Sequence, residues 1–588
     1  MYTYEGDEVV KRQHEWVGGV IDTAPLDLAY DTQNDAVWLA EANSLHKLSA
    51  NMQWWRYGQK QGSPFDNVTS VAAVGGFVYV GSDKGLARVR GDADPSGAAS
   101  PHGSGHADPW KWQFFSGNRY LVDNAVQSLT ANEGGESLVV MTATASGLSL
   151  MESELWTLAE KARAMGQFQE PRHDRRGLVA DCTLQEYGDL GSYQKQVKDN
   201  DGLWTTMHGL GEAYRYMATG EPEARAAAWK AFEAAELLSV LPGAYPSYPA
   251  RSFCVPADGD SGCGTQGGEE RWHYSTIPGY EDYLWKDDTS SDEIDGHLAF
   301  YPLVYDHIAS TPEERARAYK LIDGITGGIL ENDYFLIDPV SQKPTTWGFW
   351  GPVSLNDNPE HYSERGGNSV EILAYLASAY SVTKDDRYKE GFWDLALNHG
   401  YIYNTQNAKV DSPEEDNHSD NELIYMAYHV LLYSLQRLQV QEGADAALLA
   451  DVQDMVNALV PSLVRSWSIV RGEKSPLWLG IYAGTGAAVA SVCPSSFSDA
   501  VWTLRRWAID LIAWPVVNSE RWDVNPSPFT ARDSTDREIQ EIIPPQERQT
   551  GHWNGDPFKM DVGGGTSESE PSIWRLPYYL MLYNRMIV

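Results

Sequence analysis

One short stretch of the chain is crowded with acidic side chains. The sequence WKDDTSSDEIDGH, residues 285–297, holds four aspartates and one glutamate and ends on a histidine. Hydrolysis of a glycosidic bond needs two carboxyl groups with different pKa values, one acting as an acid and the other as a base or nucleophile. Crowding and an adjacent aromatic side chain can separate those pKa values through mutual repulsion and desolvation. The stretch therefore predicts such a carboxyl pair; the alternative is a solvated acidic loop that caps a helix.

Within this stretch, Asp288 is the strongest candidate for a catalytic acid or base. It precedes the helix expected from Asp292, so its side chain is freer than one engaged in capping. Asp292 and Glu293 fall in the first turn of that helix and are the next candidates. His297 follows Glu293 by four residues, so the two share a helix face, and we expect His297 to contact the substrate.

The motif HSDNE, residues 418–422, is the natural partner of the first stretch. His418 precedes a predicted helix, and Asp420 and Glu422 enter its first turn. We expect Asp288 and Glu422 to lie on opposite sides of a cleft, with His418 and Asp420 beside them. The alternative for His418 is a structural hydrogen bond to a neighbouring loop.

Three predicted helices open alike, at TSSDE (residues 289–293), GNSVE (367–371) and HSDNE (418–422). Each has Ser at or near the N-cap and Glu close behind, which is the pattern of a capping box. The alternative to catalysis is therefore that Glu293, Glu371 and Glu422 only cap helices.

The aromatic composition favours a sugar-binding surface. The chain has 22 Trp and 32 Tyr against 14 Phe. Trp and Tyr combine an apolar face with a hydrogen-bonding edge, which suits a pyranose ring, whereas a plain core is served equally well by Phe. The alternative is a large helical core that uses Trp. The tryptophans predicted to contact substrate are Trp204, Trp285, Trp347, Trp350 and Trp553.

The elements that must position these residues change in type along the chain. Three segments, beginning at Pro25, Asp66 and Asp123, repeat one β pattern of alternating strands and turns. Val37-Trp38, Val78-Tyr79 and Leu138-Val139 occupy equivalent places, as do Ser44-Leu45, Gly85-Leu86 and Gly147-Leu148. The repeats resemble the propeller blades of two-component-regulator sensor domains. Three copies fall short of a full propeller, so we expect a partial one or a small β-domain over residues 1–153.

From about Leu155 the pattern is helical, with two kinds of helix in alternation. Polar helices rich in Ala, Glu and Arg begin near Glu221, Thr311, Lys384 and Gly443. Aromatic helices, apolar nearly all round and therefore expected to be buried, begin near residues 202, 292, 368, 419, 498 and 571. This alternation resembles the six-hairpin (α/α)6 toroid of glycan-active enzymes. We therefore expect a mainly α chain, with residues 154–588 as the toroid and catalytic domain.

The toroid resemblance implies that loops at the N-termini of the inner helices line the cleft. Those loops contain the acidic stretches described above, and helix N-termini stabilise carboxylates. They also contain EHYSERGGN, which brings together His361, Tyr362, Arg365 and Asn368. Toroid polysaccharide lyases use these residue types: Arg or Asn neutralises a uronate carboxyl while Tyr or His removes the C5 proton. β-Elimination is therefore the alternative to hydrolysis, and a non-catalytic glycan-binding protein is the third hypothesis.

The overall charge limits the partners. The 588 residues include 45 basic and 82 acidic side chains, for a net charge of −37. Such a surface repels phosphate backbones and anionic lipid, so we expect neither nucleic acid nor membrane as a partner, but an oligo- or polysaccharide substrate. It also disfavours an anionic polymer. The sequence contains no motif of kinases, zinc proteases or α/β-hydrolases, so those enzyme classes have no support. The sequence does not determine the oligomeric state.

Cysteine spacing bears on the compartment. Cys254 and Cys263 lie in a Gly/Asp/Ser-rich loop that could close as a disulfide; the alternative is two free thiols. We expect the disulfide, and with it a secreted or periplasmic protein whose signal peptide is absent from the sequence given. No catalytic metal or cofactor is predicted. A structural calcium ion is conceivable at DNDG (residues 199–202) or DGDSG (258–262), although neither continues to the Glu of an EF-hand.

Overall fold

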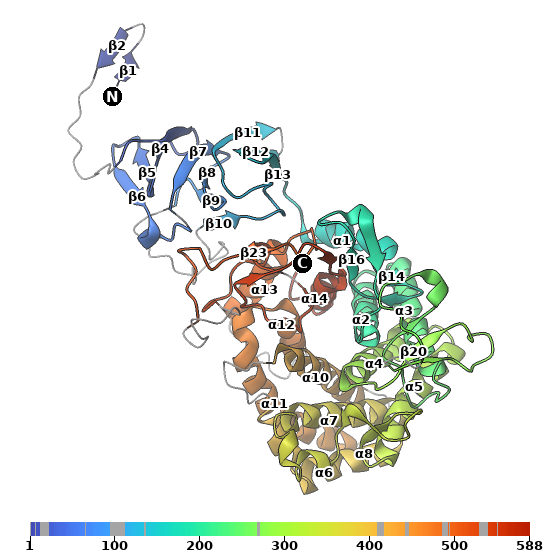
Figure 1. The fold of residues 1–588 in the computed structure, drawn as a ribbon. Helices are drawn as coiled ribbons and strands as arrows, with labels where there is room; N and C mark the ends of the chain where they lie inside the picture. Colours follow the sequence, from blue (N-terminus) through green and yellow to red (C-terminus); the bar gives the residue numbers. More distant parts are fainter. Residues whose placement is uncertain are drawn as a thin grey trace. The chain divides into compact units, whose positions relative to one another are not determined.

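The computed structural model describes residues 2–5, 8–11, 23–64, 66–93, 112–134, 137–266, 271–408, 417–440, 446–484, 492, 494–527, 539–549 and 551–588. The chain divides into two compact units (Figure 1). The first comprises Met1–Trp156, Trp514–Arg548 and Lys559–Gly563, and the second comprises Thr157–Ala513, Gln549–Phe558 and Gly564–Val588. The sequence predicted a single boundary after residue 153. The structure differs, because two late segments belong to the first unit.

Hydrogen bonds within the first unit explain this difference. The backbone N–H of Phe114 donates to Glu547 Oε1 at 3.1 Å, across 433 residues of sequence. The backbone N–H of Trp522 donates to the carbonyl of Pro64 at 2.8 Å. Arg521 forms a buried ion pair with Glu547 at 3.0 Å. A local sequence pattern contains no signal for contacts over such separations.

The first unit contains three antiparallel sheets, one for each predicted repeat, in the strand orders β3-β4-β5-β6, β10-β9-β8-β7 and β11-β12-β13. A separate pair is formed by β1 (Tyr2–Glu5) and β2 (Glu8–Lys11), and another by β23 (Val516–Val517) and β24 (Asp561–Val562). The strands of the three sheets are β3 (Asp27–Asp31), β4 (Ala36–Glu41), β5 (Ser44–Ser49), β6 (Trp54–Tyr57), β7 (Val68–Val74), β8 (Phe77–Ser82), β9 (Leu86–Arg90), β10 (Trp112–Phe115), β11 (Ser128–Gly134), β12 (Ser137–Thr144) and β13 (Gly147–Ser153).

The equivalent residues of the repeats fall at equivalent places in these sheets. Trp38, Tyr79 and Val139 lie in β4, β8 and β12, each of which pairs with the strand that follows it. Gly85, just before β9, and Gly147, the first residue of β13, have φ of +147° and +148°, a conformation that favours glycine. Two apolar clusters, one around Trp38 and Val78 and the other around Tyr79 and Val140, hold the sheets together.

The second unit is predominantly helical. Its helices are α1 (Leu158–His173), α2 (Asp201–Thr219), α3 (Pro222–Val240), α4 (Ser291–Leu303), α5 (Pro312–Glu331), α6 (Pro352–Leu355), α7 (Arg365–Thr383), α8 (Asp386–Trp393), α9 (Tyr401–Thr405), α10 (His418–Gln439), α11 (Ala446–Val470), α12 (Pro476–Gly484), α13 (Pro494–Arg506) and α14 (Ser572–Tyr583). Short strands between them are β14 (Asp174–Arg175), β15 (Leu178–Val179), β16 (Cys182–Leu184), β17 (Tyr193–Lys195), β18 (Phe253–Cys254), β19 (Trp272–Tyr274), β20 (Leu284–Lys286), β21 (Phe335–Ile337), β22 (Pro344–Phe349) and β25 (Ser567–Glu568).

The two predicted kinds of helix pack in different ways. The apolar helices contact one another in succession: α2 packs on α4, α4 and α7 on α10, α12 on α14, and α14 on α2. Polar helices pack on their outer sides, with α3 on α2, α5 on α4 and α7, α8 on α7, and α11 on α10. α2, α4, α7, α10 and α14 are buried along most of their length.

One predicted buried helix is wrong. The sequence favoured the segment from Ser498 as a buried helix, but α13 ends at Arg506 and keeps exposed faces. The buried helix next to it is α12, Pro476–Gly484, in which every residue from Pro476 to Ala483 is buried. At nine residues, α12 is too short for its apolar run to be distinguished from a strand by periodicity alone.

Among the residues that the structure describes, one helical stretch, Ala446–Glu473, is long and apolar enough to span a membrane by length and composition. A core helix of a soluble protein meets the same criterion. α11, which makes up most of this stretch, contributes Val452, Met455, Leu459 and Leu463 to the apolar core of the second unit.

Candidate functional site

The N-terminal ends of four helices surround a cleft of about 250 Å³ in the second unit. Asn200 comes from the start of α2, and the starts of α4, α7 and α10 supply most of the remaining lining. The lining residues are Asn200, Arg251, Ser290, Ser291, Asp292, Trp347, Ser363, Glu364, Gly367, Asn368, Glu371, Ala408, Asn417, Ser419, Asp420, Leu423 and Ile424. The partial positive charge at helix N-termini makes this an environment in which carboxylates can gather.

Glu371 is a buried carboxyl that reaches the cleft. Only 2% of its surface is exposed, and its Oε2 accepts a hydrogen bond of 2.6 Å from Trp350 Nε1. Burial, together with the nearby carboxylates of Asp292, Asp420 and Glu364, raises the pKa of Glu371 to about 8, although the Trp350 hydrogen bond opposes the rise. Glu371 is therefore protonated at neutral pH.

Two other acids share the cleft with Glu371. Asp292 is half-buried in the first turn of α4 and accepts a hydrogen bond of 2.6 Å from Ser290 Oγ. Its carboxylate also raises the pKa values of buried Glu293 and Glu422. Asp420 lies in the first turn of α10 and accepts a hydrogen bond of 2.8 Å from Asn417 Nδ2. The cleft thus holds Glu371, whose pKa is raised, together with the carboxyl groups of Asp292 and Asp420.

Glu422, the predicted partner of Asp288, is a buried carboxyl of α10. It is 1% exposed, and its Oε1 meets no hydrogen-bond donor among the described residues. Burial raises the pKa of Glu422 to about 8; His552 opposes the rise, while Asp292 and Glu570 reinforce it. The carboxyl is therefore neutral at pH 7, but it is not among the residues that line the cleft.

Glu293 caps α4, which is the alternative role that the sequence predicted for it. Its Oε2 accepts hydrogen bonds from the backbone N–H (3.1 Å) and Oγ (2.9 Å) of Ser290, the N-cap of α4. Asn200 Nδ2 donates to its other oxygen at 3.1 Å. Burial raises the pKa of Glu293 to about 7, against the effect of Arg251. His297 is fully buried with Nδ1 2.6 Å from the carbonyl of Glu293, and burial lowers its pKa to about 4, so it is a neutral core histidine.

The carboxylate of Asp288 is bound by residues of neighbouring segments of the chain. Its two carboxylate oxygens accept hydrogen bonds of 2.8 Å from the N–H and Oγ1 of Thr346, and Arg271 pairs with it at 2.9 Å. The backbone of Asp288 has φ +56°, a conformation that its partners must hold in place. It does not line the cleft. Asp292, and not Asp288, is therefore the acidic residue of this stretch that lines the cleft.

Of the five predicted tryptophans, only Trp347 lines the cleft, and it is 53% exposed. Trp350 is fully buried and supports Glu371 rather than offering a stacking face. The other three are buried as well. Trp204 packs on His552 with ring centroids 3.9 Å apart, Trp285 packs on His273 at 4.9 Å, and Trp553 Nε1 donates to the carbonyl of Ile573 at 2.9 Å.

One residue of the predicted elimination set lines the cleft, and the others contact neighbouring protein groups. Arg365 donates to the backbone carbonyls of Leu355 at 2.5 Å and Asn356 at 3.4 Å. His361 stacks on Phe349 at 4.2 Å, and Tyr362 is 59% exposed beside Arg365. Asn368 alone lines the cleft, and its Nδ2 donates to the carbonyl of Phe349 at 3.0 Å.

His418, the first residue of α10, lies between two carboxylates, with Nε2 3.3 Å from Asp556 and Nδ1 3.7 Å from Glu473. This arrangement matches the structural alternative given for it. Asp556 comes from the segment 549–558, which belongs to the same unit.

Sequence reasoning missed Glu371 and its buried neighbour Asp295 as site residues. GNSVE was interpreted as the start of a helix, but α7 begins at Arg365, so Glu371 lies six residues inside it and cannot cap it. The signal available was helical spacing: Glu371 and Tyr375 are four residues apart and share a face with Asn368.

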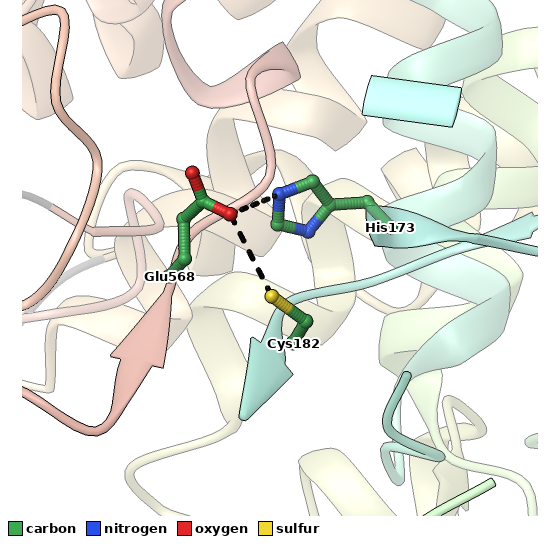
Figure 2. A group of neighbouring side chains, drawn as sticks. All are labelled: His173, Cys182 and Glu568. Carbon is green, nitrogen blue, oxygen red and sulfur yellow. Dashed lines mark hydrogen bonds and ion pairs between the residues drawn. The ribbon is translucent and has the colours of Figure 1, made fainter. Parts of the chain in front are cut away.

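A second cluster of potential ligands, shown in Figure 2, lies elsewhere in the helical unit. His173, Cys182 and Glu568 are buried, with ligand atoms within 4.8 Å of one another. Glu568 accepts two hydrogen bonds from Arg172, at 2.5 and 2.7 Å, and its Oε2 is 3.2 Å from His173 Nε2. Burial and Glu568 raise the pKa of Cys182 to about 12, which keeps the thiol protonated. These contacts form a hydrogen-bonded structural cluster, in which the guanidinium of Arg172 already neutralises the carboxylate of Glu568.

The two calcium-like loops likewise hold basic side chains. Asp199 pairs with Lys286 at 2.5 Å, and Asp201 pairs with Arg175. In the second loop, Asp258 pairs with Arg176. Protein cations thus neutralise the carboxylates that a calcium ion would need. The same region contains the predicted disulfide, which is confirmed: Cys254 and Cys263 are bonded.

Comparisons with known proteins give little guidance. No family model matches the chain, and no curated protein matches it. One solved structure, titled a polysaccharide lyase, aligns with 100% of this chain and 92% of its own, at 10% sequence identity and a TM-score of 0.29.

Proposed function

We propose that the helical unit is a carbohydrate-active enzyme that hydrolyses glycosidic bonds of an uncharged oligo- or polysaccharide. The single observation that carries the proposal is the pairing of a protonated buried acid, Glu371, with Asp292 and Asp420 in one cleft. This is the acid–base inequality that glycoside hydrolysis requires.

In this proposal Glu371 is the general acid. It donates its proton to the glycosidic oxygen as the bond to the anomeric carbon breaks. Asp292 is the base or nucleophile: it either takes a proton from an attacking water or forms the covalent glycosyl intermediate that water then hydrolyses. Asp420, in the first turn of α10, is the alternative for this role.

The charge of the cleft supports an uncharged substrate. Arg251 is the one basic side chain among the described residues that line it. Its guanidinium lies 3.8 Å from Glu293 and donates at 3.3 Å to Ser290 Oγ and to the carbonyls of Asp199 and Asp288. A uronate carboxyl in the cleft would therefore be repelled by several carboxylates, and the one cation, Arg251, already binds protein groups. This also disfavours elimination, which needs the uronate to be neutralised.

The setting of the cleft agrees with a saccharide ligand. Trp347 presents an exposed face at its edge, where a pyranose ring can stack. The succession of apolar helices inside polar ones supports an (α/α)6 toroid, and the three sheets of the first unit support a partial propeller. The Cys254–Cys263 disulfide supports an oxidising location, secreted or periplasmic.

The decisive experiment incubates the purified protein with a panel of neutral and uronate-containing polysaccharides and measures two products. Hydrolysis releases reducing ends without ultraviolet absorbance, whereas elimination creates an absorbing unsaturated uronide. We expect reducing ends alone, from neutral polymers. General acid catalysis contributes roughly 10²–10⁴-fold, so Glu371→Gln should lower kcat by that factor.

Asp288→Asn is the matched control, because it alters a nearby carboxylate outside the cleft. A product that absorbs in the ultraviolet would show that the reaction is elimination and not hydrolysis. Saccharide binding without any bond cleavage would instead support a glycan-binding protein, and full activity of Glu371→Gln would remove the assigned acid.

A further inference from the structure

A second carboxyl lies next to the proposed acid. Asp295, from α4, is fully buried and does not line the cleft. Tyr375, one turn after Glu371 on α7, donates its hydroxyl to Asp295 Oδ1 at 2.7 Å. Asp295 also lies within hydrogen-bonding reach of the Glu371 carboxyl. Two acids from adjacent buried helices therefore meet, and only Glu371 of the two lines the cleft.

The hydrogen-bond partners of Asp295 indicate which of its oxygens holds a proton. Asp295 Oδ1 accepts from Tyr375, but Oδ2 meets no donor among the described residues, and the group beside Asp295 is another carboxyl. Two carboxylates cannot hydrogen-bond unless one of them holds a proton. Asp295 satisfies this requirement when Oδ2, the oxygen that meets no donor, carries the hydrogen itself.

The surrounding charges favour protonation of both acids. The charged groups that act on the pair are carboxylates: Asp292 from α4, Glu364 before α7 and Asp420 from α10. Burial and Glu371 raise the pKa of Asp295 well above its usual range, although the Tyr375 hydrogen bond opposes the rise. Because Glu371 reaches the cleft and Asp295 does not, Glu371 is the member that can exchange its proton with a ligand.

We propose that Asp295 is a positioning residue that stays protonated and donates a hydrogen bond from Oδ2 to the carboxyl of Glu371. This role rests on the proposed hydrolysis, whereas the protonation state itself does not. At rest the pair holds two protons. When Glu371 gives its proton to the glycosidic oxygen, the carboxylate that remains is stabilised by two donors, Trp350 Nε1 and the Asp295 hydroxyl. The pair then holds one proton until Glu371 is reprotonated.

The first test is independent of any substrate. Infrared difference spectra between the wild-type protein and Asp295→Asn report whether the lost group is a carboxylic acid or a carboxylate. We expect a carboxylic acid band at pH 7 that persists after Glu371 has ionised above about pH 8. Asp338→Asn is the matched control: Asp338 accepts from Tyr248 at 3.0 Å, as Asp295 does from Tyr375, but backbone N–H groups lower its pKa. Its difference spectrum should show a carboxylate. A carboxylate signal from Asp295 at pH 7 would overturn the proposal.

The second test separates positioning from packing. Asp295→Asn retains an N–H donor toward Glu371, whereas Asp295→Ala removes it. A hydrogen bond to a charged group is worth about 10–100-fold, so Asp295→Ala should lower kcat by that factor with little change in KM, and Asp295→Asn should recover most of it. Equal loss in both variants would refute the donor role. If no substrate is hydrolysed at all while the infrared result holds, the protonated pair stands and the proposed function fails.

Discussion

The indole nitrogen of Trp350 lies 2.6 Å from Glu371 Oε2, and this hydrogen bond links a fully buried tryptophan to the carboxyl that reaches the cleft. The donor stabilises the ionised form of Glu371, so it limits the rise in the pKa of Glu371 that burial causes. One contact thus adjusts the pH range over which Glu371 can serve as an acid.

Replacing Trp350 by Phe should shift the pH dependence of hydrolysis. Without the donor the pKa of Glu371 rises further, so the proton is retained to higher pH and the alkaline limb of kcat/KM moves upward. The measurement is a pH–rate profile with whichever polysaccharide of the panel the wild-type protein hydrolyses. Trp478→Phe is the control, because Trp478 donates to Glu473 at 2.8 Å and neither residue lines the cleft. An unmoved alkaline limb in Trp350→Phe would contradict the assignment.

Asp292 and Asp288 should respond differently to the same chemical change. Asp292→Asn removes a carboxylate that lines the cleft, and a drop in kcat of roughly 10²–10⁴-fold is expected. Asp288→Asn should leave the rate within a few-fold of wild type, because its carboxylate pairs with Thr346 and Arg271. Steady-state kinetics of both variants decide the point; the reverse order of effects would restore Asp288 as the reacting group.

The ion pair of His552 and Asp181, whose atoms lie 2.9 Å apart and whose side chains are 11% and 20% exposed, should make stability depend on pH. Burial opposes both charges, but the pairing holds the pKa of Asp181 at about 2 and raises the pKa of His552 to about 9. The His552 contribution is fully present below its unfolded pKa of about 6.5 and is lost as pH rises through 9; the Asp181 contribution is lost as pH falls from about 4 to 2.

His552→Gln tests this dependence. The variant should be less stable than wild type by about 2–3 kcal/mol at pH 6, and the difference should shrink above pH 9. Urea unfolding at both pH values gives the two free energies. A difference that does not change between pH 6 and 9.5 would show that the loss comes from packing against Trp204 and not from charge.

The disulfide should stabilise the helical unit. The bond between Cys254 and Cys263 closes a short loop, with a sequence separation of 9, for which loop-closure entropy gives about 2–3 kcal/mol. The double variant Cys254→Ser/Cys263→Ser should lose that much in chemical unfolding. Thiol titration of the unfolded, unreduced protein should find two reactive cysteines of the four. Four reactive thiols without reductant would show that the bond is absent from the purified protein.

The sequence by itself determined the local elements. Alternating apolar residues with Gly-Leu steps predicted three β repeats, and each forms its own antiparallel sheet. The polar helices near Glu221 and Thr311, and the buried helices containing Trp204 and Glu422, follow from 3.6-residue periodicity. The disulfide follows from spacing within one loop. All of these elements depend on interactions between residues close in the chain, which is why they can be predicted from the sequence alone.

The tertiary structure decided which acids meet. Glu293, Glu371 and Glu422 follow the same pattern in sequence, yet only Glu293 caps its helix, only Glu371 reaches the cleft, and Glu422 is buried without lining it. The difference depends on where each helix begins and on what packs around it. Desolvation and the approach of Asp292 from another helix set the pKa values of these groups, and both arise only when segments distant in sequence pack together.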